Sequence, residues 1–499
     1  MCLLRSKPLA VRGVELMSLT DLITILPLLV LAGGAVLIML VLTVFRNHSL
    51  TLVLTVLTLA FSLAALVVSS MTPSKQVTSL LVFDSYTLFF MALIFGSALA
   101  VCVLSFGYMR DRRNIKEEFY ILILLASLGC AGIVASSHFI SFFLSLEILS
   151  VSLYVLIAYP RSEPNHIEAG IKYLIPAATS VAFLLMGAAF IYAYSGTMSF
   201  SGIVFSSANV SIAHNPFLLV GLVMVIIGIG FKLGIVPFHL WMPDVYQGAP
   251  APVTGFIATA SKGAVFALLL RYWTTINVYD CKPLFTAIVV IAIVTMLFGN
   301  LLALLQNNVK RILAYSSIAH IGYLLTALLA GGTLAAVAIM FYLLTYFITT
   351  LGAFGVITVL SGKQTDIEML DDYRGLSSRH PYLSAIFTGF LFSLAGIPLT
   401  AGFIGKFYIF SANVDARLWL LLIVLIISSV IGLFYYLRII VALYKPADEQ
   451  QVIQGAAPSM SFAGGLVLVL LTAALLLIGI YPSPFIGLVK VMMSGLGGI

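Results

Sequence analysis

Residues 228 to 262 read GIGFKLGIVPFHLWMPDVYQGAPAPVTGFIATASK. The apolar runs of this stretch carry two lysines, Lys232 and Lys262, in neighbouring segments that otherwise hold almost no charge. A lysine at the centre of a membrane-spanning helix costs about 2.5 to 3.5 kcal/mol on insertion scales, so it is retained where function requires it. Prolines at positions 237, 243, 250 and 252 interrupt the same stretch. The pattern predicts a membrane protein whose functional side chains lie beside breaks in its helices.

The composition of the whole chain also predicts a membrane protein. Of its 499 residues, 62% are hydrophobic and only 9% are charged, whereas soluble domains are about 25% charged. A net charge of +7 would suggest nucleic acid binding in a soluble protein. Here the basic residues mostly occupy short loops between apolar runs, so they report membrane topology. We expect the lipid bilayer as a partner and no nucleic acid.

The sequence carries no pattern typical of a metal site or a redox cofactor. Its four cysteines, at positions 2, 102, 130 and 281, stand singly, without the spacing of a disulfide framework, a zinc site or an iron–sulfur cluster. It has no dinucleotide-binding glycine motif after a strand and no phosphate-binding loop. We expect no cofactor-binding residue and no metal ligand on this chain.

Runs of about 20 apolar residues are the relevant unit, because that length crosses the hydrocarbon core. We expect an all-α polytopic membrane protein with 14 transmembrane helices. The predicted helices occupy residues 22–45, 50–70, 81–107, 118–135, 138–158, 170–194, 217–241, 252–277, 284–305, 312–331, 335–360, 382–411, 417–444 and 462–481.

Lysine and arginine are distributed unevenly among the loops that connect these helices. Loops after odd-numbered helices hold twelve of them, and internal loops after even-numbered helices hold four. The positive-inside rule therefore places the odd loops in the cytoplasm and both termini on the opposite face. The basic residues 1–16 argue weakly against this assignment, and we expect them to be a non-native or disordered extension before the true start at Met17.

Proline and glycine break two of the long segments, helix 7 at Gly234–Pro237 and helix 12 at Gly396–Gly402. Breaks in corresponding positions indicate inverted repeats with the transport site at the breaks. The breaks lie five helices apart, and because five is odd the second copy must be upside down. We expect five parts: 1–16, 17–117 with helices 1–3, 118–277 with helices 4–8 as the first repeat, 278–445 with helices 9–13 as the second, and 446–499 with helix 14 and a short tail.

Glu147 lies about ten residues into predicted helix 5, far from either boundary. An ionised carboxylate at that depth must be neutralised or paired with a buried cation, and Lys232 is the expected partner. A Lys–Glu pair can be switched between charged and neutral forms, as a proton relay requires. A neutral glutamic acid and a static ion pair are the structural alternatives. His239, seven residues beyond Lys232, is a possible relay residue or a packing histidine.

Three more ionisable residues extend this series. Lys262 lies about ten residues from either end of its segment, among small residues that let water or a helix approach. His320 lies about nine residues beyond Lys310 and could pass a proton at neutral pH. Lys406 directly follows the second break and would be the exit residue. Snorkelling of the lysines and a satisfied core histidine are the structural alternatives.

Four other charged residues lie nearer the membrane boundaries. Lys172 and Lys310 are possible members of the relay on the cytoplasmic side. Asp84 and Arg438 are assigned no role, because their predicted positions are close to helix ends or to the boundary.

Three stretches resemble the proton-translocating, antiporter-like subunits of respiratory complex I. They are FKLGIVPFHLWMPDVYQGAPAPVTGFIATASKGAVFALL (231–269), QNNVKRILAYSSIAHIGYLL (306–325) and SLAGIPLTAGFIGKFYIF (393–410). The resemblance covers nearly the whole chain from Met17 onward. WMPDVYQGAPAPV (241–253) and DDYRGLSSRHP (371–381) look specific to one bacterial member. Lys406 stands where a sister subunit has glutamate, and we do not expect the long lateral helix of another sister subunit.

The resemblance implies a membrane subunit of H⁺-translocating NADH:quinone oxidoreductase in the bacterial inner membrane. The neighbouring antiporter-like subunit and small membrane subunits would be its partners, and flavin and iron–sulfur clusters would belong to partner subunits. Quinone would be a substrate of the complex. Residue by residue, the resemblance implies Glu147 and Lys232 as a pair, Lys262 as the connecting lysine, His320 as a relay and Lys406 as the terminal lysine.

Under this hypothesis, quinone reduction elsewhere weakens the pairing of Glu147 with Lys232. The proton of Lys232 then passes through water, Lys262 and His320 toward Lys406. The alternative function is a subunit of a multi-protein cation/proton antiporter, since those share lysine-bearing breaks. A scaffolding role with static buried charges is a further alternative.

Overall fold

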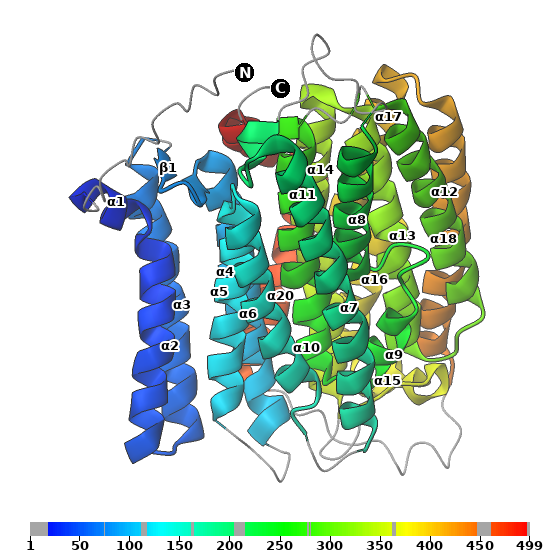
Figure 1. Cartoon of the computed structure of the whole chain (residues 1–499). Helices are drawn as coiled ribbons and strands as arrows, with labels where there is room; N and C mark the ends of the chain where they lie inside the picture. The colour runs from blue at the N-terminus through cyan, green and yellow to red at the C-terminus, as the bar shows by residue number, and fades with distance from the viewer. Residues whose placement is uncertain are drawn as a thin grey trace, which may run out of the picture.

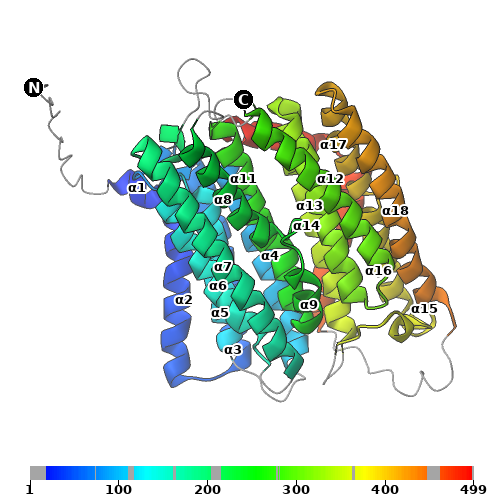
Figure 2. The same cartoon turned by 45° about the vertical axis from the view of Figure 1, so that its right-hand side comes forward.

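A computed structural model describes residues 18–73, 75–110, 117–160, 164–203, 215–276, 279, 281–361, 366–446 and 461–496. Within these residues, 13 helices are long and apolar enough to cross a membrane. The long helices stand side by side along one common direction (Figure 1), and a view turned by 45° shows the same arrangement (Figure 2). The predicted all-α polytopic fold is confirmed.

The first helices form a hairpin at one edge of the molecule (Figure 1). Asn47 caps the N-terminus of α3 (His48–Ser70), because its side chain accepts hydrogen bonds from the backbone amides of Ser49 and Leu50. A short antiparallel strand pair follows, which sequence analysis does not predict because three-residue strands leave no periodic signal. The elements are α1 (Leu19–Thr24), α2 (Leu26–Val44), α3 (His48–Ser70), β1 (Lys75–Val77) and β2 (Leu81–Phe83).

The next long helices lead to the first break and include one that is 32 residues long and contains Pro176. They are α4 (Ser85–Arg110), α5 (Glu118–Ala135), α6 (Phe139–Ile157), α7 (Pro164–Ser195), the short η1 (Phe200–Ile203) and α8 (Pro216–Leu233).

The first break begins where α8 ends. Gly234 adopts a left-handed φ of +69°, and the amide of Ile235 bonds back to the carbonyl of Gly230 at 3.1 Å. This is a Schellman-type helix end, which glycine permits because it has no Cβ. After the turn the chain forms α9 (Trp241–Gly248), α10 (Ala251–Phe256), the π-helical η3 (Ile257–Ser261) and α11 (Lys262–Ile276).

The second break repeats this backbone geometry. Gly396 has a φ of +84°, and the amide of Ile397 bonds to the carbonyl of Phe392 at 3.0 Å. The predicted helix 12 is therefore two shorter helices, α16 and α17. This half contains α12 (Lys282–Leu304), α13 (Val309–Ala330), α14 (Gly332–Leu360), η5 (Leu370–Tyr373), α15 (Leu376–Arg379), α16 (Pro381–Ala395), α17 (Ala401–Asp415) and α18 (Trp419–Tyr444).

The chain closes with helices that pack back on the bundle. α20 (Phe462–Ile480) is long enough to span, and α21 (Ser483–Met493) with η6 (Ser494–Leu496) is a shorter apolar helix beyond the predicted helix 14. The amphipathic pattern of α21 is too short to distinguish from a tail by sequence.

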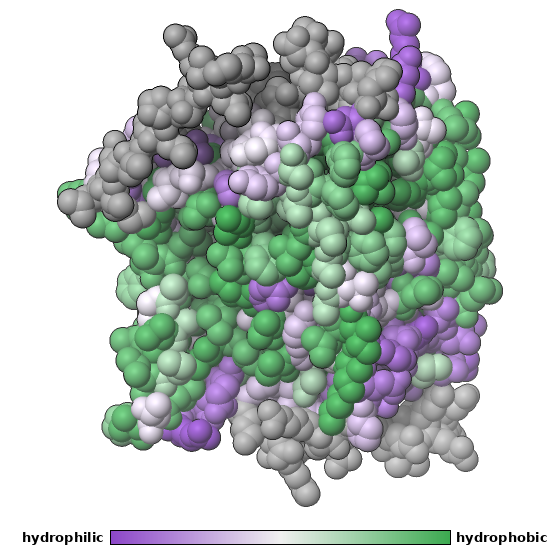
Figure 3. All heavy atoms as spheres, in the orientation of Figure 1, coloured by the Kyte–Doolittle hydropathy of each residue, from purple (hydrophilic) through white to green (hydrophobic). Residues whose placement is uncertain are grey.

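The most buried crossings lie at the centre. The windows within Ala251–Ile276 and Val309–Ala330 are buried completely inside the bundle. Most of the visible flank is apolar, and a larger hydrophilic area lies at the lower right, near the end where Figure 1 shows α9 and α15 (Figure 3). Lipid-facing helices therefore surround a core that carries the candidate lysines.

Candidate functional site

Lys232 lies in the last turn of α8, directly before the first break. Its side chain is buried, and its Nζ donates a hydrogen bond to Ser150 Oγ of α6 at 2.7 Å. The same Nζ lies 5.3 Å from the centroid of the Tyr173 ring of α7. The first break thus places an ammonium between a hydroxyl and an aromatic face.

Lys262 begins α11, directly after the π-helical turn of η3. Such turns occur frequently at functional sites, because they displace one residue from the regular helix. The buried Nζ of Lys262 donates to Ser317 Oγ of α13 at 2.5 Å and to Met242 Sδ at 3.0 Å. It lies 5.4 Å from the centroid of the Tyr246 ring.

Lys406 lies in α17, and its side chain reaches back to the second break. Its Nζ donates to the carbonyl of Ala395 at 2.8 Å and to Ser429 Oγ at 3.0 Å, and it lies 5.5 Å from the centroid of the Tyr323 ring. Ala395 is the last residue of α16, so the lysine satisfies a carbonyl that the break leaves without a helical partner.

The three lysines share one environment, which we call the serine–tyrosine cradle. In each cradle, one serine hydroxyl accepts a hydrogen bond from the lysine ammonium. One tyrosine ring lies beside the same ammonium. A hydroxyl can also donate to a neutral amine, so it supports both the charged and the neutral lysine. A ring stabilises the cation without supplying a counter-charge. The cradles are Ser150 with Tyr173, Ser317 with Tyr246, and Ser429 with Tyr323.

His320 of α13 lies between the second and third cradles. Its Nδ1 is hydrogen-bonded to the hydroxyl of Tyr342 at 2.6 Å, and its Nε2 to that of Tyr436 at 3.1 Å. It lies within electrostatic reach of both Lys262 and Lys406. Each ring nitrogen of the histidine therefore has its own tyrosine partner.

Polar side chains join the cradles to this histidine. Tyr346 bonds to Ser317 at 2.7 Å, and its ring centroid lies 5.4 Å from that of His320. On the far side, Asn300 donates to the hydroxyl of Tyr323 at 3.1 Å and accepts from Tyr435 at 2.9 Å. The line from Lys262 to Lys406 is therefore lined by hydroxyl and amide groups.

The sequence alone does not mark these tyrosines and serines as a group. Serine and tyrosine are common in membrane helices, and nothing in their spacing marks one as a neighbour of a lysine. Only packing between helices far apart in the sequence reveals them, as with Ser317 and Lys262 or Ser429 and Lys406.

Glu147 is half-buried on α6, one turn before Ser150. Its Oε1 is buried and has no hydrogen-bond partner among the described residues. Lys232 instead donates a hydrogen bond to Ser150. Its interaction with Glu147 is electrostatic and acts over a longer distance. Nearby Leu144 and Val151 are exposed on the same helix. The carboxyl therefore lies close to the edge of an outward-facing apolar surface.

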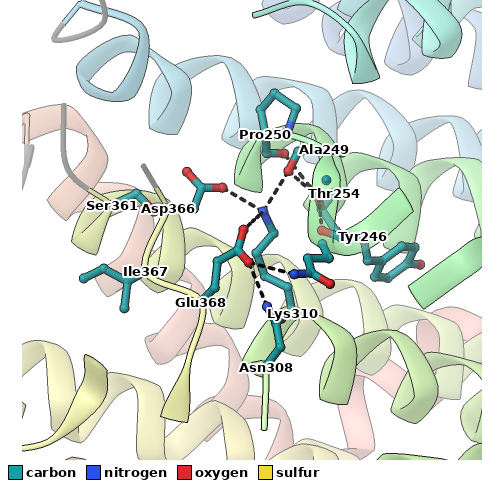
Figure 4. A network of polar contacts seen from close by, with 12 residues as sticks. Tyr246, Ala249, Pro250, Thr254, Asn308, Lys310, Ser361, Asp366, Ile367 and Glu368 are labelled. Atoms are coloured by element: carbon teal, nitrogen blue, oxygen red, sulfur yellow. Dashed lines mark hydrogen bonds and ion pairs between the residues drawn. The ribbon is translucent and has the colours of Figure 1, made fainter. Parts of the chain in front are cut away.

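Lys310 is buried near the start of α13, in the network of Figure 4. Its Nζ lies 2.8 Å from Asp366 Oδ2, 3.8 Å from Glu368 Oε1 and 2.8 Å from the Ala249 carbonyl oxygen. Asn308 also donates to Glu368, at 2.8 Å. Unlike the cradle lysines, Lys310 is held by carboxylates.

Lys172 lies at the surface of α7, outside the line of cradles. It contacts Glu168 and Asp244, each at 2.8 Å, and Arg311 contacts Asp244 at 2.6 Å. Burial raises the pKa of Asp244, but hydrogen bonds from Lys172 and Arg311 outweigh it, so the net pKa lies below its usual range. This cluster ties α7, α9 and α13 together.

The remaining predicted residues are not brought into the line by a described contact. His239 is buried in the turn between α8 and α9. Asp84 forms a bidentate ion pair with Arg271 at 2.8 and 2.9 Å, and Arg438 donates to the carbonyl of Leu304 at 2.7 Å. These last two arrangements fasten helix ends. No group of three potential metal-ligating side chains occurs in the described part of the chain.

Comparison with known families and structures gives consistent matches. Residues 136–432 match the family model described as NADH:quinone oxidoreductase/Mrp antiporter, TM. Two relatives are named NADH-quinone oxidoreductase subunit N. That of Ectopseudomonas mendocina is 46% identical, over 94% of this chain and 96% of its own. That of Nitrosospira multiformis is 48% identical, over 96% of each chain.

Solved structures show the same fold. A chain of respiratory complex I from Thermus thermophilus is 31% identical, with a TM-score of 0.79 over 92% of this chain and 98% of its own. A chain of the Mrp complex from Dietzia is 20% identical, with a TM-score of 0.84 over 96% of this chain and 98% of its own. At that identity the second likeness concerns the fold alone.

Proposed function

This chain belongs to the NADH-quinone oxidoreductase subunit N family, and we propose that its three serine–tyrosine cradles are the stations of its proton relay. The chain is a proton-translocating membrane subunit of NADH-quinone oxidoreductase, with other membrane subunits of that complex as partners. The observation that carries the relay is the shared environment of Lys232, Lys262 and Lys406.

The proton moves between groups that are each stable with and without it. A change of charge near Glu147 alters the electrostatic support of Lys232. Lys232 then releases a proton that passes to the neutral amine of Lys262. From Lys262 the proton reaches His320, whose two ring nitrogens are bonded to tyrosine hydroxyls, and then Lys406. Each transfer leaves the donor neutral, as an amine or imidazole, and the acceptor charged, as an ammonium or imidazolium.

Electrostatics over short distances can drive these transfers. A unit charge pair about 4 Å apart interacts by roughly 4 kcal/mol at an effective dielectric of 20. That energy corresponds to about three units of pKa. A change of one unit charge at that distance is therefore enough to move a proton from one lysine to the next.

The membrane and the orientation follow from the charge of the loops. The multi-pass chain would lie in the bacterial inner membrane, with the loops that carry Arg46, Arg311, Arg374 and Lys445 in the cytoplasm. Both termini would then be periplasmic. Flavin and iron–sulfur clusters would reside in partner subunits, and quinone would be reduced there.

Charge-keeping substitutions at the two ends of the relay test this proposal. Lys232→Arg and Lys406→Arg keep a cation but cannot release a proton, so each should lower proton translocation by the assembled complex about tenfold or more. Proton uptake by inverted membrane vesicles during NADH oxidation measures it. Lys282→Arg, at the exposed start of α12, is the matched control. Full translocation by both relay variants would refute the relay, whereas Na⁺/H⁺ exchange by the purified single chain would favour the antiporter alternative.

A further inference from the structure

A polar cavity of about 550 Å³ opens beside the Lys310 network. We call it the vestibule. Its charged lining consists of Glu168, Lys172, Asp244, Arg311, Asp366 and Glu368. The lining holds four carboxylates and two cations, and the formal charge stays negative when Lys310 behind them is counted, so the lining attracts protons and other cations. The cavity is large and polar enough to hold several water molecules.

Lys310 lies directly behind the acids of the vestibule. Asp366 and Glu368 line the cavity, and each also contacts the ammonium of Lys310, which is only 1% exposed. The opposite side of the ammonium faces inward and donates to the carbonyl of Ala249. Figure 4 shows the lysine enclosed between these groups. A proton that entered from the vestibule would meet this fixed positive charge.

Beyond Lys310, the same face of α13 leads to the second cradle. Ser317 lies seven residues further on, about 10 Å along the helix axis, and it accepts the hydrogen bond of Lys262. Tyr246 lies beside this route: its side chain is buried, and its ring faces Lys262. Lys310 therefore separates the vestibule from the central lysine of the relay.

The partners of Lys310 distinguish it from a relay residue. The cradle lysines bond to hydroxyls that serve either protonation state, whereas two carboxylates hold Lys310 as a cation. A fixed cation in a narrow polar passage is an electrostatic barrier to protons. Movement of its ammonium toward the vestibule would lower that barrier without any loss of its own proton.

We propose that the vestibule is the entrance for protons bound for Lys262, and that Lys310, clamped by Asp366, Glu368 and the Ala249 carbonyl, is the electrostatic gate that closes it. The inference rests on the proposed relay, because Lys262 is the residue that the entrance serves. The proton comes from water in the vestibule and ends on the neutral amine of Lys262, and Lys310 stays charged throughout.

Two substitutions at Lys310 separate a gate from a relay. Lys310→Gln removes the barrier, so the number of protons retained per NADH oxidised should fall about threefold through leakage. Lys310→Arg keeps the charge and should keep most of that ratio. A relay lysine would behave differently, because arginine cannot release a proton and both variants would fail alike. Equal failure of the two variants in fully assembled complexes would overturn the gate.

Blocking the vestibule tests the entrance independently of Lys310. In a chain with Cys2→Ser, the remaining cysteines at 102, 130 and 281 are buried. An impermeant sulfonate thiol reagent added to inverted vesicles would modify Asn165→Cys in the vestibule and should slow proton translocation about threefold. The matched control is Asp371→Cys, which lines a second cavity of about 490 Å³ and should be insensitive when modified.

The outcomes distinguish this inference from the function on which it rests. If the labelled Asn165→Cys complex translocates protons at the unlabelled rate while the relay lysines prove essential, the entrance is wrong and the relay stands. If the relay lysines are dispensable, the proposed function fails first. Slower translocation on labelling in the vestibule alone supports the entrance.

Discussion

The two helix breaks have the same backbone and different electrostatics. Gly234 and Gly396 both take left-handed φ values, +69° and +84°, and in both breaks the next residue, an isoleucine, bonds back five residues. Lys232 precedes its break, on the α8 side, while Lys406 follows its break and reaches back to the Ala395 carbonyl. Each break therefore has one lysine beside it. The lysine comes before the break in the first case and after it in the second.

The difference lies in the neighbouring charge. Lys232 lies within electrostatic reach of Glu147, a carboxyl near the outward surface of α6. Lys406 is held by a carbonyl, a serine and a tyrosine ring. We therefore expect the first break to respond to a change of charge at the outward surface of α6. Lys406 instead lies within electrostatic reach of His320, a group inside the chain.

We expect the largest effect from a substitution that adds a methyl group at the second break and so distorts its backbone. A Cβ at Gly402 would lie 1.9 Å from the carbonyl oxygen of Ser393, a backbone atom that cannot move aside. Gly402→Ala should therefore destabilise the α16–α17 pair by about 1 to 3 kcal/mol or more. The yield of assembled complex and its thermal unfolding measure this. Gly389→Ala in α16 meets no atom within 4 Å and is the control; equal yields would contradict the account.

A smaller effect should follow removal of the charge that distinguishes the first break. Glu147→Gln keeps the shape of the side chain but removes its electrostatic influence on Lys232, so coupled proton translocation should fall about three- to tenfold. Asp415→Asn, at the exposed end of α17, should change little. The initial rate of vesicle acidification during NADH oxidation measures both. A rate unaffected by Glu147→Gln would mean that the two breaks are electrostatically equivalent.

The smallest effect concerns the ion pairs of Asp244 near the first break. Because its pKa is lowered in the folded chain, its ion pairs stabilise the fold above the unfolded carboxyl pKa of about 3.9 and are lost as the pH falls through the lower folded value. Asp244→Asn should lower thermal stability at neutral pH by less than about 1 kcal/mol, since the group is partly exposed. The substitution should also reduce the loss of thermal stability that occurs when the pH is lowered into the acid range. An unchanged loss of stability in that range would show that these pairs contribute nothing.

The sequence predicts the crossings and the breaks because both have strong local signals. Apolar runs of membrane length mark the helices, and Gly234 and Gly396 beside prolines mark the breaks. Buried lysines stand out because charge is rare at that depth. The candidate relay residues can therefore be identified in the sequence simply as ionisable residues within apolar segments.

The partners of these lysines cannot be predicted in the same way. Ser317 and Lys262 are 55 residues apart, and Lys310 and Asp366 are 56 apart. Such pairs depend on how helices pack, and serine, tyrosine and loop acids carry no distinguishing local pattern. The sequence likewise groups Lys310 with the relay lysines as a possible member. Only its carboxylate partners set it apart from residues held by hydroxyls.

The most direct test of the relay is the number of protons translocated per NADH oxidised when Lys262, which lies between the two breaks, becomes arginine. Arginine keeps the charge beside Ser317 but cannot give up a proton. We expect the assembled Lys262→Arg complex to lose the share of protons that this subunit carries. A full wild-type ratio at wild-type assembly would contradict this expectation.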